Sequence, residues 1–290
     1  MDNYLKQTPY SDPGSLDLRG LPDDPGRLAG IVRDAVVHRG EGGRFGYDIP
    51  EQRLRDDAES RYVTEMLRVL RERSDRPLTE PRTPEERFVG TCRDFALLHC
   101  SLLRATGTPA RLRCGFATYF GEDGFHDDHW VVEYLAEDGA VRLADPQVHH
   151  GYDMTFDPLD VPRDRFLVAP QAWRMCRDGS ADPRTFGVRG LGSAGLSYTG
   201  LWFVRADVRR DLAALGGVEV LPWDEWGPEL ADDASLTEAE LALVDTVATT
   251  ADEGALRRLF EDPRLAVPEE ITSYTTYDGI RKVRLSAPPA

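Results

Sequence analysis

Apolar residues recur at intervals of three and four positions in two stretches near the start of the chain. The segment "RLAGIVRDAVVH" (residues 27–38) has this period, and so does "AESRYVTEMLRVLRER" (residues 58–73), where Tyr62, Met66 and Leu70 share one face. Such a period is typical of a helix that buries one side. We therefore predict two helices in this part of the chain.

A third helix is predicted directly after Cys92, in the stretch "FVGTCRDFALLHCSLLRATGTP". Phe95, Leu98 and Leu102 fall on one stripe of this helix. The pattern ends at "TGTP", where Gly107 suits a left-handed position beyond the helix and the following proline forbids its continuation. Cys92 is therefore expected at the first turn of the helix.

The period changes from helical to alternating after this helix. In "RLRCGFATYF", Leu112, Cys114 and Phe116 alternate with polar or charged residues, which indicates a strand. "HWVVEYL" and "AVRLAD" predict two more strands joined by the turn "AEDG", and further helices are expected around residues 171–176 and 238–260. A helix followed by a sheet, with helices on both sides in the sequence, favours an α+β fold.

The chain divides into four parts by this pattern. The first is rich in proline, glycine and aspartate, and the second is mainly helical. The expected parts are an extended N-terminal arm (1–25), N-terminal helices (26–87), a core that carries the chemistry (88–150), and a C-terminal loop and helical extension that packs on the core (151–290).

The charge balance excludes two classes of partner. The chain has 35 lysine and arginine residues against 51 aspartate and glutamate residues, a formal net charge of −16. Such a surface repels phosphate backbones and anionic lipid, so we expect neither nucleic acid nor a membrane as partner. The N-terminal "MDNYLKQTPYSDPGS" has no signal-peptide pattern, and no apolar run reaches about 18 residues, so a cytoplasmic location is expected.

The four cysteines, Cys92, Cys100, Cys114 and Cys176, do not form a recognisable redox or zinc motif, because no pair has C-x-x-C spacing. Cys92 and Cys100 would lie about 12 Å apart along one helix, which is too far for a disulfide. Cys100 and Cys114 are expected to be packing residues. Cys176 has no evident partner.

Cys92 is the cysteine whose position favours chemistry. At the first turn of a helix, the positive end of the helix and its unpaired N–H groups favour a thiolate over a thiol. The same N–H groups can hold an oxyanion. The alternative interpretation is a small buried residue at a helix start, which is the commoner use of a free cysteine.

A thiolate nucleophile needs a base and a group that orients the base. The turn "AEDG" centres near residues 137 and 138, so hairpin residues whose numbers sum to about 274–276 face each other. His129 and Asp145 should therefore lie opposite or one diagonal apart, on the same face. The alternative is a satisfied core histidine and an exposed aspartate at the end of a strand.

These segments carry a resemblance. "GTCRDFALLHCSLLRATGTPARLRCGFATYF", then "DDHWVVEY", then "LADPQ" resembles the core of the transglutaminase-like superfamily over residues 88–147. The resemblance implies a papain-like fold in which Cys92 is the nucleophile, His129 the general base and Asp145 the orienting acid. Segments 156–177 and 200–227 also resemble a subgroup of bacterial transglutaminase-like proteins.

The resemblance implies acyl transfer through a thioester acyl-enzyme on an amide or thioester substrate, ending in hydrolysis or in amide formation or exchange. The expected partners are a small-molecule or peptide acyl donor and an optional amine acceptor, with no cofactor and no metal. Protein-crosslinking members have an aromatic residue after the nucleophile, whereas Arg93 and Asp94 follow Cys92 here. Crosslinking of protein glutamines is therefore not the expected reaction.

Two other classes of function stay open. A binding protein could keep the fold without turnover, although none of the three residues is missing. A metal-dependent hydrolase could use His126 and His129 of "HDDH", but this motif lacks a helical Glu-bearing context.

Overall fold

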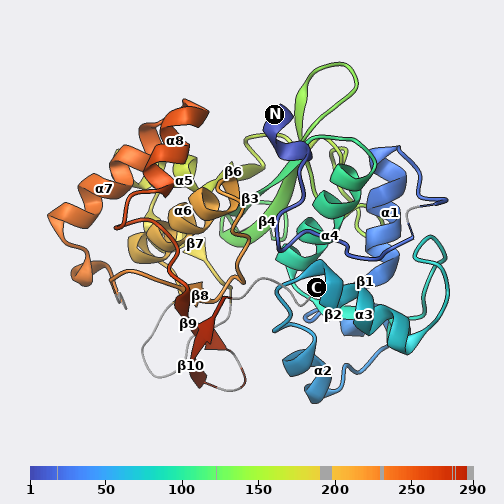
Figure 1. The fold of residues 1–290 in the computed structure, drawn as a ribbon. Coiled ribbons are helices and arrows are strands. Elements are labelled where there is room, and N and C mark those ends of the chain that lie inside the picture. The colour runs from blue at the N-terminus through green and yellow to red at the C-terminus, as the bar shows by residue number, and fades with distance from the viewer. Residues whose placement is uncertain are drawn as a thin grey trace.

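The computed structural model describes residues 1–17, 19–121, 123–189, 198–228, 232–275, 277 and 279–285. These residues form helices and a curled antiparallel sheet, which confirms the mixed helix-and-sheet class that the sequence predicted (Figure 1). The helices are α1 (Pro25–Ala35), α2 (Glu51–Asp56), α3 (Val63–Arg73), α4 (Cys92–Ala105), α5 (Ala169–Arg177), α6 (Leu201–Leu215), α7 (Glu238–Thr249) and α8 (Glu253–Phe260). Short 3₁₀ helices lie at Asp2–Leu5, Gly42–Phe45, Pro84–Glu86, Pro183–Thr185 and Asp233–Ser235.

The main sheet has the strand order β5-β4-β3-β6, with β7 paired in parallel to β4. Its central pair, β3 and β4, is antiparallel and places Cys114 opposite Trp130. On the other side of β4, Val132 faces Ala144 of β5. These strands are β3 (Ala110–Ala117), β4 (His126–Leu135), β5 (Val141–Ala144), β6 (Phe166–Val168) and β7 (Phe186–Gly187).

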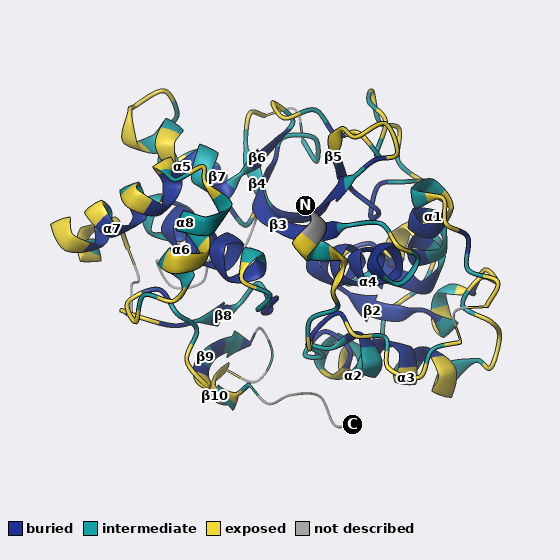
Figure 2. Cartoon of the chain, turned by 45° about the horizontal axis from the view of Figure 1, so that its top comes forward, coloured by how far each residue is buried: buried dark blue, intermediate teal, exposed yellow. Residues whose placement is uncertain are grey.

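Two buried helices pack against this sheet. Helix α4 contacts β3 and β4 and is surrounded by α1, α3 and the N-terminal segments, whereas α6 contacts β3 together with α5 and α7 (Figure 1). The apolar core is divided accordingly. One cluster joins α4 to α1, α3 and the sheet, and a second joins α5, α6 and α7. Figure 2 shows that α4 and the central strands are largely buried while α7 lies on the outside.

The start of α4 follows from its local sequence. Strand β2 (Phe88–Gly90) leads through Thr91 into Cys92, and Asp94 accepts a hydrogen bond from the backbone N–H of Thr91 at 2.8 Å. This reciprocal cap closes the first turn of the helix. At the other end Gly107 has a φ of +97°, the left-handed conformation that the sequence predicted after the helix.

The first predicted helix is shorter than expected. Helix α1 ends at Ala35, and Val36–His38 form strand β1, which pairs in parallel with β2 and places His38 opposite Gly90. The two β-branched residues Val36 and Val37 fit a pleated strand, and the pairing with β2 outweighs the helical period. The prediction of a helix to residue 38 is therefore wrong at its end.

The C-terminal part contains elements that the sequence analysis did not find. Helix α5 agrees with the prediction around 171–176, but the segment 238–260 is interrupted between α7 and α8. Helix α6 and a small sheet of order β10-β9-β8 were not expected. The strands of this sheet are β8 (Asp224–Glu225), β9 (Glu270–Thr275) and β10 (Gly279–Arg284).

Among the described residues, no helix is both long enough and apolar enough to span a membrane.

Candidate active site

Cys92 lies where strand β2 passes into helix α4. It is the first residue of the helix and is 8% exposed. The backbone N–H of Trp130, the residue after His129 on β4, lies close enough to the Cys92 sulfur to lower the pKa of the thiol. The start of α4 therefore meets the sheet beside the predicted histidine.

His129 and Asp145 are in direct contact. The register of β4 and β5 sets their side chains one diagonal apart on the same face, and His129 Nε2 lies 2.7 Å from Asp145 Oδ2. Both side chains are buried. The diagonal contact agrees with the geometry that the hairpin turn predicts.

Asp145 is held by further donors. Tyr119 donates its hydroxyl to Oδ2 at 2.7 Å, and the backbone N–H of Gln147 donates to Oδ1 at 3.0 Å. Burial alone would raise the pKa of Asp145, but the interactions with His129, Tyr119 and Gln147 outweigh it and lower the pKa. The carboxylate is therefore ionised, so it accepts a hydrogen bond from the N–H at His129 Nε2 and leaves Nδ1 as the basic nitrogen.

Aromatic rings surround the imidazole of His129. The rings of Tyr119, Phe120 and Phe166 meet it edge-on, with centroids at 5.9, 4.9 and 6.3 Å. Such a cage restricts the imidazole to few orientations and limits access of water. The hydrogen bond from His129 to Asp145 is thus formed in a largely apolar setting, where it is stronger than in water.

The sequence analysis expected a thiolate at Cys92, whereas the structure favours the neutral thiol. Burial raises the pKa of its thiol well above the ordinary value, and the negative charges of Asp128, Asp94 and Asp145 raise it further. The N–H of Trp130 acts in the opposite direction but is outweighed. In addition, the Asp94 carboxylate occupies the end of the helix, which offsets the positive helix terminus on which the thiolate expectation rested.

Two residues beside the site were missed by the sequence analysis. Tyr119 lies two residues beyond the end of β3, and no local pattern indicated its contact with Asp145. His38 is brought near His129 by the pairing of β1 with β2. Burial, followed by nearby positive groups, lowers the pKa of His38 to about 3, so its ring is neutral. Because Nδ1 accepts the N–H of Gly40 at 3.1 Å, the ring proton lies on Nε2.

Arg93 and Asp94 are buried and paired with each other at 3.0 Å. Arg93 also donates to the backbone oxygens of Arg61 and Glu219. Both side chains therefore hold the beginning of α4 against neighbouring segments instead of contacting a substrate.

The "HDDH" segment does not bring its two histidines together. Residues 126 and 129 lie on opposite faces of β4, because side chains alternate along a strand. His126 stacks on Phe186, whereas His129 contacts Asp145. Within the described ranges, the group that could hold a metal ion is instead Cys114, Asp128 and Asp207.

Residues 57–146 match the family model of the transglutaminase-like superfamily, which confirms the resemblance seen in the sequence. The match includes Cys92, His129 and Asp145 and extends upstream to Asp57, which precedes α3. It does not extend to the later segments, whose resemblance to a bacterial subgroup stays a prediction. Searches of curated proteins and of solved structures found no match.

Proposed function

We propose that this protein is a cysteine-dependent acyl-transfer enzyme with a papain-like arrangement of Cys92, His129 and Asp145. The observation that supports it best is the buried contact between His129 and Asp145, on the strand that helix α4 meets with Cys92 at its first turn. The family match suggests cysteine-based acyl transfer or hydrolysis for the same region.

Because the pKa of Cys92 is raised, the thiolate nucleophile must form during the reaction and is not present beforehand. Because burial and three carboxylates favour the neutral thiol, ionisation requires transfer of its proton to a base during the reaction. In the proposed mechanism His129 accepts this proton at Nδ1 while Asp145 holds Nε2. The imidazolium that results is stabilised by the adjacent carboxylate.

The chemical steps are those of acyl transfer. The Cys92 sulfur attacks the carbonyl carbon, a carbon–sulfur bond forms, and backbone N–H groups at the start of α4 bind the oxyanion. The bond to the leaving group then breaks as His129 returns the proton to it. Water or an amine attacks the resulting thioester, releases the acid or amide and restores the thiol. The proposed donor is a small-molecule or peptide amide or thioester.

Acylation of the nucleophile tests the proposal without a known substrate. A series of p-nitrophenyl esters is offered to the wild type, and the acylated residue is identified by peptide mass spectrometry. We expect an acyl group on Cys92, none in Cys92→Ala, and acylation slowed by about 100-fold in His129→Ala. Cys100→Ala is the matched control, because this buried thiol lies on the same helix. Acylation that persists elsewhere at the wild-type rate in Cys92→Ala would contradict the assignment.

The competing hypothesis is a binding protein that keeps the fold without turnover. The raised pKa of Cys92 favours it, because a neutral buried thiol is a poor nucleophile. The rate of iodoacetamide labelling of Cys92 against pH separates the two. Labelling that depends on His129 supports the enzyme, whereas equal profiles in wild type and His129→Ala support the binding protein.

A further inference from the structure

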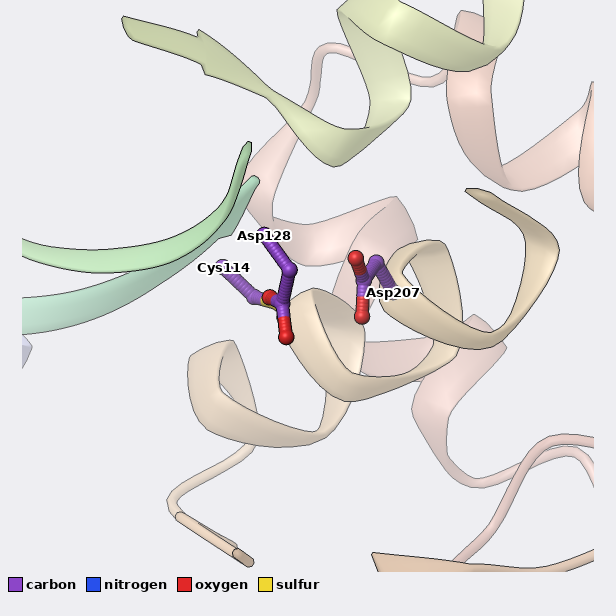
Figure 3. A group of neighbouring side chains, drawn as sticks. All are labelled: Cys114, Asp128 and Asp207. Atoms are coloured by element: carbon purple, nitrogen blue, oxygen red, sulfur yellow. The ribbon is translucent and has the colours of Figure 1, made fainter. Parts of the chain in front are cut away.

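A second group of reactive side chains lies between the sheet and helix α6. Cys114 of β3, Asp128 of β4 and Asp207 of α6 offer one atom each, and these three atoms lie within 4.8 Å of one another. Figure 3 shows the two strand residues side by side and Asp207 opposite them on its helix. None of the three forms a bond or transfers a proton in the acyl-transfer mechanism, in which Asp128 acts only through its charge near Cys92.

Two oxygens of this group lack partners. Asp207 is fully buried; its Oδ1 accepts from Arg210 Nη1 at 2.7 Å, but Oδ2 has no hydrogen-bond partner of normal geometry. The Cys114 thiol lies close enough to lower the pKa of Asp207, although no hydrogen bond of normal geometry joins them. Oδ1 of Asp128 is also buried without a partner. Buried polar atoms are usually hydrogen-bonded, so two orphaned oxygens beside a thiol require an explanation.

The charged groups around the cluster do not explain the two oxygens without partners. Arg210 is shared between Asp207 and Glu225, so its one positive charge is already divided between two carboxylates. In the part of the chain that the structure describes, no ion pair reaches Asp128. The cluster therefore holds two carboxyl groups and a thiol against one shared guanidinium, so a bound cation would balance these groups in their ionised forms.

We propose that Cys114, Asp128 and Asp207 form a binding site for a divalent cation of the zinc type. Zn²⁺ accepts both thiolate and carboxylate ligands, whereas Ca²⁺ and Mg²⁺ take oxygen ligands. Bond lengths of about 2.3 Å to sulfur and about 2.0–2.2 Å to oxygen require ligand atoms roughly 3.5 Å apart. The present separations are close enough to reach this by side-chain rotation.

The site has an entrance. Asp128 is partly exposed, while Cys114 and Asp207 are buried. A cation can therefore approach from the Asp128 side. On binding, the Cys114 thiol gives its proton to solvent and the sulfur becomes the metal ligand.

Cobalt(II) is the probe, because a thiolate bound to it absorbs in the near ultraviolet. Untagged full-length protein is treated with a chelator, freed of it and titrated with Co²⁺. We expect saturation at one equivalent and a thiolate-to-cobalt band that is lost in Cys114→Ser. The band should persist in Cys92→Ala, which removes the proposed nucleophile, and in Cys100→Ser, the matched buried thiol. Zinc should displace the cobalt and abolish the band.

Absence of the band in the wild type would overturn the proposal and indicate that the two carboxyl groups share a proton instead. Loss of the band in Cys92→Ala with retention in Cys114→Ser would overturn it equally, by assigning the metal to the other site. If circular dichroism shows that Cys114→Ser does not fold, Asp207→Asn decides. Its zinc affinity should fall by about 10-fold or more, and an unchanged affinity counts against the site.

Discussion

Helices α4 and α6 are both buried against the same sheet, but they are buried in different ways. In α4 the buried charges, Arg93, Asp94 and Arg104, lie in the first and last turns, and the middle of the helix is mainly apolar. In α6 the buried charges run through the middle of the helix. They are Arg205, Asp207, Arg209, Arg210 and Asp211.

The charges of α6 are stabilised by specific partners. Asp211 accepts two hydrogen bonds from Arg113 and a third from the backbone N–H of Cys114. Arg205 and Arg209 share Glu240 of α7. Apolar packing tolerates small changes of geometry, whereas a buried ion pair stabilises only when both members are present. The half of the molecule around α6 should thus be the more sensitive to loss of a single group.

Removing Asp211 should give the largest effect. Asp211→Ala leaves Arg113 without its bidentate partner in a buried position and frees the N–H of Cys114, so we expect a loss of about 4 kcal/mol in the free energy of unfolding. Urea denaturation measures it. Asp138→Ala is the control, because its pair with Arg142 is exposed and should contribute under about 1 kcal/mol. Equal small losses in both variants would mean that the α6 network adds nothing.

An apolar change in α4 should have a slightly smaller effect. Leu98 is fully buried, and Leu98→Ala leaves a cavity that costs about 3 kcal/mol. Unlike the loss in Asp211→Ala, this one leaves no buried charged group without its partner. The volume-conserving Leu98→Met should cost under about 1.5 kcal/mol. A loss in Leu98→Ala larger than that in Asp211→Ala would remove the distinction between the two helices.

His99 is a buried titratable residue in the otherwise mainly apolar middle of α4. Its titration should appear in the dependence of the free energy of unfolding on pH. Burial lowers its pKa from 6.5 to about 4, so the unfolded chain binds the proton first as the pH falls. Stability is therefore lost as the pH falls from 6.5 toward 4, by about 1.6 kcal/mol between pH 6.5 and pH 5. His99→Gln should flatten this part of the profile in thermal unfolding. An unchanged slope would assign the loss to other groups.

A polar contact outside both helices gives the smallest effect. Tyr119→Phe removes the hydroxyl that donates to Asp145 and should cost about 1.5 kcal/mol, because the acceptor is charged. Chemical denaturation measures the loss, and Tyr198→Phe is the exposed control. A loss as large as that of Asp211→Ala would place the most sensitive ionic contact at Asp145 instead.

The same contrast explains which elements could be predicted from the sequence. Helix α4 has a cap, an apolar stripe and a glycine stop, and its start at Cys92 was predicted correctly. Helix α6 was missed, because arginine and aspartate occupy buried positions and interrupt the apolar period. Their partners, such as Arg113 and Glu240, lie far away in the sequence. Long-range ion pairs leave no local signal.

In the candidate site, too, contacts between distant segments could not be predicted from the sequence. The contact of His129 with Asp145 could be predicted, since a tight hairpin sets its own register. The raised pKa of Cys92 could not, because it depends on burial and on Asp128 and Asp145, which reach the helix only in the folded chain. Likewise, His38 comes near the site through a strand pairing between distant segments.

In strand β4, Asp128 of the proposed metal site stands directly before His129 of the candidate active site. Asp128 faces Cys114 and Asp207 on one side, and His129 faces Asp145 on the other. Because side chains alternate, inserting or deleting one residue within this strand would exchange the two faces. A substitution in β4 changes one of these groups at a time, whereas a change in the length of the strand would remove both at once. Natural variation in length is therefore expected in the loops on either side of β4 and not within it.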